Sequence, residues 1–297
     1  MPRFASPAKQ ANSIINALRK DKTIPSIRSG ENYKERLTII GSKAAEWGLP
    51  MLRAMSVQDC INYLERRGEE VQQATLNTER LALQYTLELM GTLDKTKNER
   101  LPVVKSELDE IKTSRAYTRD QVELIKERMG PKYQLLLDIY LETGLRAADI
   151  FTLLPIEEQT PSDRPANEEK FLGRGRNGVP YSTDSKGGLV REVRLPPHLA
   201  ERLEQFRLDK PVTIVDRDVR LEKNYDLPGG KQLSNAFYRA SIRALGWSRG
   251  LHGLRHTFAQ ERMTELQNHG LKYERALETV SQELGHFSPN TTLVYLR

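Results

Sequence analysis

Apolar residues recur at helical spacing through the first third of the chain, and this periodicity most constrains what the sequence can fold into. Five of them lie three or four residues apart and so share one stripe of a helix: Tyr33, Leu37, Ile40, Ala44 and Trp47. Similar patterns predict helices over residues 56–64, 74–90 and 102–111. The sequence therefore predicts a small all-helical first domain over residues 30–113.

The pattern changes after residue 113. Residues 111–121 are polar and basic, which predicts a linker, and Thr118 with Gln121 forms the capping-box pattern that begins a new helix. Further along, "VPYSTDSK" and "LVREVRLP" flank Gly187-Gly188 and predict a β-hairpin. The remaining apolar segments predict helices over residues 131–143, 199–206, 233–245, 252–266 and 273–284.

A second domain is thus expected over residues 114–297, and the fold class is mainly α with a small β-sheet (α+β). Residues 157–178 are polar and contain three glycines and two prolines, which predicts an irregular insertion in that domain.

Length, charge and cysteine usage narrow the class of protein. A chain of 297 residues can hold two domains, and its net charge of +6 is modest for a nucleic-acid binder. Residues 1–28 carry six basic residues against one acidic residue, so residues 1–29 are expected to form a basic N-terminal arm. Cys60 is the only cysteine, which excludes an intrachain disulfide. With no membrane span or signal-peptide core in the sequence, a cytoplasmic location is expected.

Six polar residues in the second half of the chain carry the strongest chemical signal. In chain order they are Arg146, Lys186, His252, Arg255, His286 and Tyr295. Guanidinium forks match the non-bridging oxygens of a phosphate, and a phenol needs a cationic, imidazole-containing surrounding to act as a nucleophile. The set is therefore the one that cleavage of a phosphodiester by a tyrosine requires.

Each residue also has an ordinary structural interpretation when taken alone. Arg146 could pair with Asp149, His252 could cap its own helix, Lys186 could be a solvated residue at a hairpin tip, and Tyr295 could be half-buried packing. The joint occurrence of all six favours the functional interpretation.

The other histidines carry less signal. His198 and His269 are expected at the surface, and His256 is expected to pack behind the site rather than act in it. No carboxylate or thiol lies at metal-ligand spacing from the histidines, so no metal site is expected.

These motifs resemble those of the tyrosine recombinases, the phage-integrase-like enzymes that cut and rejoin DNA without ATP or metal. The resemblance rests on "TGLRAADI", "SKGGLVREVRLP", "LHGLRHTFA" and "LGHFSPNTTLVY", and it covers roughly residues 30–297. It implies that residues 30–113 form a helical core DNA-binding domain (SAM-like) and that residues 114–297 form the catalytic domain.

The resemblance also implies a mechanism. Tyr295 would attack the scissile phosphate, forming a 3′-phosphotyrosyl bond and freeing a 5′-hydroxyl. Arg146 and Arg255 would hold the non-bridging oxygens, Lys186 would protonate the leaving oxygen, and His252 would assist proton transfer from the phenol.

In the same family pattern, His286 would hydrogen-bond the phosphate. The expected partner is double-stranded DNA with specific recombination sites, on which a homotetramer would bring two sites together, with DNA-bending accessory proteins as further candidate partners. The expected role is that of a nucleoid-associated, site-specific recombinase or integrase, carried by a mobile element.

Two other functions stay open from the sequence. A type IB topoisomerase shares this chemistry but relaxes supercoils as a monomer, and a DNA-binding regulator could keep the fold without catalysis. The complete set of six residues favours a catalytic protein, and the "LGH" context with the helical first domain favours recombination over relaxation.

Overall fold

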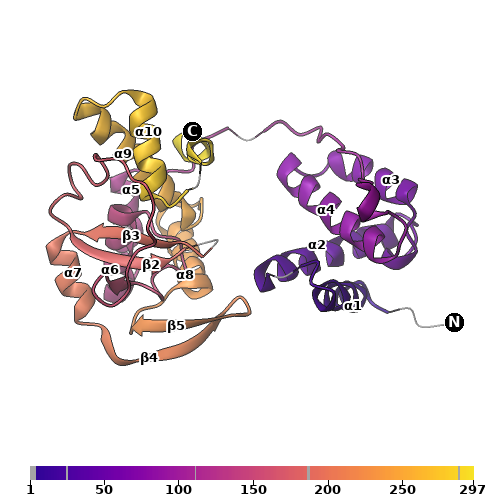
Figure 1. Ribbon diagram of the computed structural model, residues 1–297, viewed down its shortest axis with the longest axis horizontal. Coiled ribbons are helices and arrows are strands. Elements are labelled where there is room, and N and C mark those ends of the chain that lie inside the picture. The colour runs from indigo at the N-terminus through magenta and orange to yellow at the C-terminus, as the bar shows by residue number, and fades with distance from the viewer. Residues whose placement is uncertain (1–4, 25, 111, 186–187, 287) are drawn as a thin grey trace. The chain divides into compact units, whose positions relative to one another are not determined.

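The structure is a computed structural model that describes residues 5–24, 26–110, 112–185, 188–286 and 288–297. The chain divides into two compact units, residues 1–111 and 112–297 (Figure 1). This division lies two residues before the domain boundary that the sequence suggested. None of the described helices is both long and apolar enough to cross a membrane.

The first unit is helical. Its helices are α1 (Pro7–Lys20), α2 (Ile27–Glu46), α3 (Val57–Gly68) and α4 (Gln73–Leu89), with the short 3₁₀ turns η1 (Leu52–Ala54) and η2 (Lys95–Lys97). Leu37, Ile40 and Ala44 of the predicted stripe are buried in the core of this unit. Ser56 and Asp59 form a capping box that begins α3.

The predicted arm over residues 1–29 is wrong for most of its length. Residues 7–20 form α1, which packs against α2 and buries Ala11, Ile14, Ile15 and Leu18 in the core of the first unit. These residues recur at the three- and four-residue spacing of an amphipathic helix, a signal that the charge count obscured. The basic side chains of α1 lie on its exposed side.

The helix predicted over residues 102–111 is also wrong, since the described residues of this segment contain no helix. Its backbone bonds instead to side chains of α4: Leu101 N donates to Gln84 Oε1 at 2.6 Å, and Ser106 N donates to Gln73 Oε1 at 2.8 Å. The extended segment thus satisfies backbone N–H groups through side chains of α4 instead of through a helix.

The second unit combines helices with two antiparallel sheets in its described part. Its helices are α5 (Arg119–Lys126), α6 (Pro131–Thr143), α7 (Pro197–Glu204), α8 (Gly230–Leu245), α9 (His252–Asn268) and α10 (Tyr273–Glu283), followed by η3 (Pro289–Thr291) and η4 (Leu293–Leu296). Its strands are β1 (Leu154–Pro155), β2 (Val179–Asp184), β3 (Val190–Leu195), β4 (Arg207–Asp216) and β5 (Val219–Tyr225). The expected fold class, mainly α with small sheets, is confirmed.

The predicted hairpin is the β2–β3 pair, with Tyr181 opposite Val193 and Asp184 opposite Val190. β1 extends this sheet on the other side of β2. A second hairpin, β4–β5, was not expected from the sequence. Arg217 and Asp218 form its turn with positive φ angles of 50° and 62°, the backbone that a two-residue hairpin turn uses.

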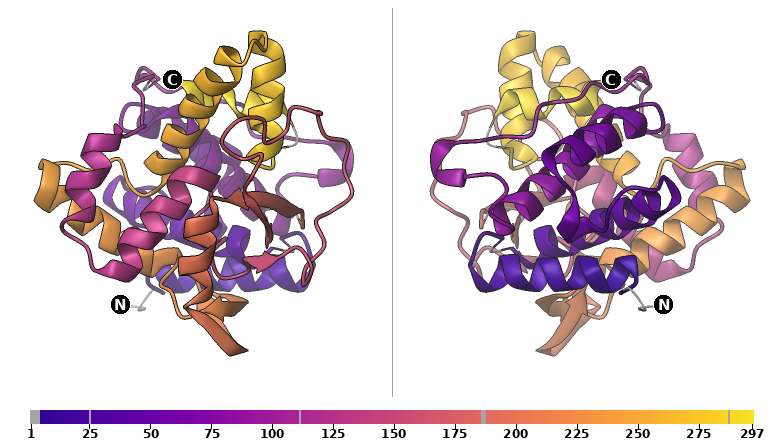
Figure 2. Two further views of the ribbon diagram at one scale, coloured as in Figure 1. Left: turned by 90° about the vertical axis from the view of Figure 1, so that its left-hand side faces the viewer. Right: turned by 90° about the vertical axis from the view of Figure 1, so that its right-hand side faces the viewer.

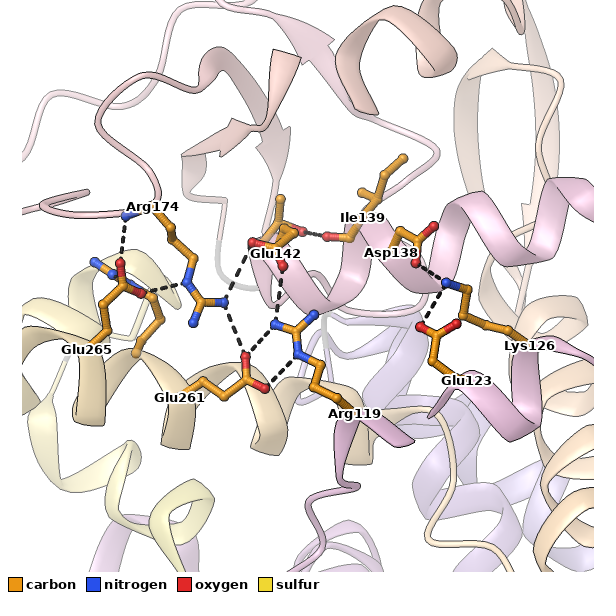
Figure 3. A network of polar contacts seen from close by, with 11 residues as sticks. Arg119, Glu123, Lys126, Asp138, Ile139, Glu142, Arg174, Glu261 and Glu265 are labelled. Atoms are coloured by element: carbon orange, nitrogen blue, oxygen red, sulfur yellow. Dashed lines mark hydrogen bonds and ion pairs between the residues drawn. The ribbon is translucent and has the colours of Figure 1, made fainter. Parts of the chain in front are cut away.

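The insertion at residues 157–178 contains turns rather than helices or strands, as predicted, and it is bonded to α9 and α10. Arg174 Nε donates to Glu265 Oε2 at 2.6 Å, and Arg174 also pairs with Glu261, which in turn holds Arg119 at the start of α5 (Figure 3). Asn167 bonds to side chains of α10. These contacts fix α9 against α5 and the insertion, while α10 packs along α9 (Figure 2).

Candidate active site

The close approach of α6 to α9 and α10 sets the position of Arg146. α6 ends at Gly144 in the left-handed conformation, with φ of 58°, as the Thr143-Gly144 pair predicted. A Cβ atom at residue 144 would lie 2.6 Å from Phe258 of α9 and 2.9 Å from Leu284, so only glycine permits this contact. Arg146 follows two residues later and therefore projects from the point where the three helices meet.

Tyr295 lies in η4 and packs its ring against the start of α9. The side chain is only 8% exposed, and its ring lies within 5.3 Å, between centroids, of the rings of His252, His256 and His286. Tyr295 Oη is 3.0 Å from His252 Nε2. The phenol of Tyr295 and the imidazole of His252, 43 residues apart in sequence, thus form a hydrogen-bonded pair.

Arg255 is the central buried residue of the site. It is 1% exposed, and its guanidinium lies 5.5 Å from the centroid of the Tyr295 ring. Arg255 Nη1 donates to the carbonyl of Gly144, and Nη2 donates to Leu284 O at 2.6 Å and to His286 Nε2 at 3.1 Å. The fork is therefore held by the ends of both α6 and α10, while its Nε has no protein partner.

His286 has a defined hydrogen-bonding state. Because an arginine can only donate, Nε2 of His286 is the acceptor from Arg255. The proton of the neutral ring then lies on Nδ1, which is 2.8 Å from Thr292 Oγ1. His286 thus links the Arg255 guanidinium to the segment that carries Tyr295.

Burial and neighbouring cations keep the histidines neutral. Desolvation, followed by the charges of Arg255 and Arg146, lowers the pKa of His286 to about 3. Desolvation and then Arg255 lower the pKa of His252 to about 3 as well, although part of that side chain is exposed. At neutral pH the His252 ring is therefore uncharged, and its Nε2 can accept a hydrogen bond from the Tyr295 hydroxyl.

Arg191 is a member of the site that the sequence interpretation missed. It is 2% exposed, on the inward face of β3, and it donates to Glu283 O at 2.6 Å and to Asp149 Oδ2 at 3.3 Å. Asp149 Oδ2 also accepts from the backbone N of Arg146 at 2.9 Å. The sequence contained one indication of this role. Arg191 stands at a position of the predicted strand whose side chain points into the core, where an apolar residue is usual.

The Asp149 carboxylate does not pair with the Arg146 side chain, whose buried Nη1 has no protein partner. Burial lowers the pKa of Arg255, and the charges of Arg146 and Arg191 lower it further. Three guanidiniums thus lie close together with one carboxylate among them, an arrangement that favours binding of an anion.

Of the six residues singled out in the sequence, the structure brings five together: Arg146, His252, Arg255, His286 and Tyr295. Lys186 lies outside the described residues, between β2 and β3. His198 and His269 are exposed and His256 is buried, as predicted. The described side chains include no group of three or more His, Cys, Asp or Glu residues that could hold a metal ion.

The depressed histidine pKa values predict a loss of stability on acidification. Desolvation lowers the pKa of the buried His256 to about 4, below the ordinary value near 6.5, so between these values the unfolded chain binds more protons than the folded one. Stability contributed by His256 is therefore present above about pH 6.5 and lost as the pH falls toward 4, at roughly 1 kcal/mol per pH unit.

This prediction can be checked by urea denaturation at pH 7 and pH 5. Unfolding is monitored by the fluorescence of Trp247 in a Trp47→Phe background. Trp47 and Trp247 are the only tryptophans, so this background reports on the second unit. His256→Gln should make the decline in the free energy of unfolding shallower, whereas the exposed His198→Gln serves as the control. An identical decline in all three proteins would contradict the prediction.

No protein-family model matches the chain, and no curated protein matches its sequence. Solved structures do match. The XerH site-specific recombinase bound to a palindromic difH substrate is 18% identical, with 90% of this chain and 76% of that chain aligned and a TM-score of 0.54. A lambda integrase dimer bound to a COC′ core site is 14% identical, with 96% and 77% aligned and a TM-score of 0.60.

A third match is the Tn1549 transposon integrase in complex with transposon right end DNA. It is 15% identical, 97% of this chain and 94% of that chain are aligned, and the TM-score is 0.57. At these identities the matches establish architecture. The protein has the tyrosine-recombinase fold, as the resemblance of its motifs implied.

Proposed function

We propose that this protein is a site-specific DNA recombinase or integrase that cleaves and rejoins DNA through a 3′-phosphotyrosyl intermediate. One observation carries the proposal: a buried phenol, Tyr295, whose hydroxyl lies 3.0 Å from a neutral imidazole nitrogen of His252, beside a cluster of guanidiniums. A nucleophile paired with a base next to an anion-binding group is the arrangement that phosphoryl transfer to a side chain needs.

In the proposed reaction, the Tyr295 oxygen forms a bond to the scissile phosphorus while His252 Nε2 accepts the phenolic proton. The bond from phosphorus to the 5′ oxygen breaks, and Lys186 gives that oxygen a proton, so a 5′-hydroxyl leaves. Rejoining reverses these steps with a 5′-hydroxyl as the nucleophile. The energy of the phosphodiester is kept in the phosphotyrosyl bond, and the reaction needs no cofactor.

Arg146 and Arg255 are proposed to hold the two non-bridging oxygens and to stabilise the charge that builds on them. Nη1 of Arg146 and Nε of Arg255 are buried and have no protein partner, so each has an unused N–H to donate. For His286 we propose a role different from the one the resemblance implied. Both of its nitrogens are engaged, by Arg255 and Thr292, so it orients Arg255 rather than contacting the phosphate.

The same proposal assigns both units to DNA binding, with the first unit as the core DNA-binding domain and the exposed basic side chains of α1 as phosphate contacts. Solved structures with this fold include a lambda integrase tetramer bound to a Holliday junction, at 16% identity and a TM-score of 0.58. We propose a tetramer on two DNA sites, with accessory DNA-bending proteins as further partners. The proposed setting is a mobile element whose recombinase acts at the nucleoid.

Covalent trapping tests this function. The purified protein is incubated with a pool of nicked "suicide" duplexes tiled across the DNA that flanks its gene, because loss of a short cleaved fragment prevents rejoining. A protein–DNA adduct that survives detergent is expected for one of the duplexes. DNA binding without any adduct would instead support the regulator, and relaxation of a supercoiled plasmid that lacks this site would support a topoisomerase.

A further inference from the structure

The segment that carries Tyr295 is held to α9 by its backbone as well as by its side chain. Gln260 Nε2 donates to Tyr295 O at 3.0 Å and to Arg297 O at 2.8 Å. The Gln260 amide therefore fixes the main chain on both sides of Leu296.

Gln260 lies on the same side of α9 as the residues that surround the phenol. His252, His256 and Gln260 follow at intervals of four residues, so they form a row along the helix. His252 contacts the Tyr295 hydroxyl, His256 packs on the Tyr295 ring, and Gln260 holds the Tyr295 carbonyl. One helix face thus contacts the hydroxyl, ring and backbone of the same residue.

Part of the Tyr295 segment is exposed, and outside α9 the segment is held through Thr292, which bonds to His286. η4 is a short 3₁₀ turn, and its Leu293 and Val294 are exposed, at 40% and 43%. Tyr295 N bonds only within the segment, to Thr292 O. Short 3₁₀ turns have weak hydrogen-bond geometry and are not stable alone, so the position of the phenol depends on contacts to α9 and to His286.

We propose that Gln260 is a positioning residue that holds the Tyr295 segment on α9 and so keeps the phenol at hydrogen-bonding distance from His252. This inference rests on the proposed function of Tyr295. Gln260 itself does not contact the phenol, so its effect on cleavage comes entirely through the placement of the tyrosine main chain.

Gln260 also contacts the segment that precedes α5. Gln260 Nε2 also lies 3.1 Å from Ser114 Oγ, in the segment that leads from the first unit into α5. A primary amide has two N–H bonds, which here are shared among three acceptors. The residue that holds the tyrosine segment therefore also contacts the start of the second unit.

Replacing Gln260 with methionine tests the proposal, because methionine keeps the length of the side chain and removes the donor. The matched control is Gln267→Met, since Gln267 is an exposed glutamine on the same helix. Two quantities are measured for both variants and the wild type. One is amide hydrogen exchange of residues 288–297 in the DNA-free protein, and the other is the single-turnover rate of covalent adduct formation on the suicide duplex.

For Gln260→Met we expect exchange in residues 288–297 to rise at least about tenfold while exchange in α9 and α10 is unchanged. Adduct formation should slow about tenfold or more, with DNA affinity within about twofold of the wild type. A residue with a merely structural role would change exchange across the whole unit. Gln267→Met should match the wild type in both measurements.

Unchanged exchange in Gln260→Met would overturn the proposal, and so would faster exchange with an unchanged rate of adduct formation. If the wild-type protein forms no adduct, the proposed function fails and its consequence for Gln260 fails with it. That outcome is distinct from a failure of the Gln260 contact alone, because the exchange measurement needs neither DNA nor cleavage.

Discussion

Tyr295→Phe is expected to abolish the covalent protein–DNA adduct completely while leaving DNA affinity within about twofold of the wild type. The substitution removes only the hydroxyl, which is the atom that would bond to phosphorus, so no slower route through this residue remains. The phenyl ring keeps the packing against His252, His256 and His286. Denaturing gel electrophoresis after incubation with the suicide duplex measures the adduct, and a mobility shift measures binding.

The expected cost of Tyr295→Phe in stability is small. The variant loses one hydrogen bond, from the phenol to His252 Nε2, which is worth about 1 kcal/mol. Tyr273→Phe is the matched control, because Tyr273 is 45% exposed at the start of α10 and outside the site. An adduct formed by Tyr295→Phe would show that another residue is the nucleophile. Loss of the adduct in Tyr273→Phe would show that the assay reports something other than chemistry at Tyr295.

Local features of the fold were predictable because short stretches of sequence determine them. The Thr118–Gln121 capping box begins α5, and the glycine after Thr143 ends α6, as the sequence indicated. The β2–β3 hairpin follows from two alternating segments around a glycine pair. In each case the physical cause lies within a few residues of the feature.

Features that depend on distant partners were harder to predict. Residues 101–110 lack a helix because Gln73 and Gln84 of α4 bond to their backbone, which no local pattern shows. The burial of Arg191 requires acceptors at Thr143, Asp149 and Glu283, so its place in the site is visible only in the folded chain.

The candidate site itself was predictable as a set of residues but not as a hydrogen-bonded arrangement. Order and local context were enough to select Arg146, His252, Arg255, His286 and Tyr295. Nothing in the sequence showed that His286 uses both nitrogens on Arg255 and Thr292. The backbone contacts of Gln260 were equally hidden, since a glutamine on a helix is most often a solvated side chain.

Arg255→Lys is expected to slow covalent cleavage by roughly 10² to 10³-fold, equivalent to about 3–4 kcal/mol of transition-state stabilisation. Lysine keeps the positive charge but loses the planar fork, which here donates to Gly144 O, Leu284 O and His286 Nε2 and has an unpartnered Nε. Single-turnover adduct formation on the suicide duplex, at saturating protein, measures this rate apart from DNA affinity.

Because Arg255 is buried, the same substitution also lowers stability, and a second buried arginine separates the two effects. Arg262 lies seven residues along α9, is 1% exposed, and pairs with Glu283 at 2.8 Å rather than with the residues around Tyr295. Arg262→Lys should lower the free energy of unfolding by about 1–3 kcal/mol but leave the cleavage rate within about threefold at temperatures where the protein is folded. Only a guanidinium that contacts the reacting phosphate should slow cleavage by more than its effect on folding explains. Equal losses of cleavage rate in Arg255→Lys and Arg262→Lys would therefore mean that Arg255 acts through stability alone.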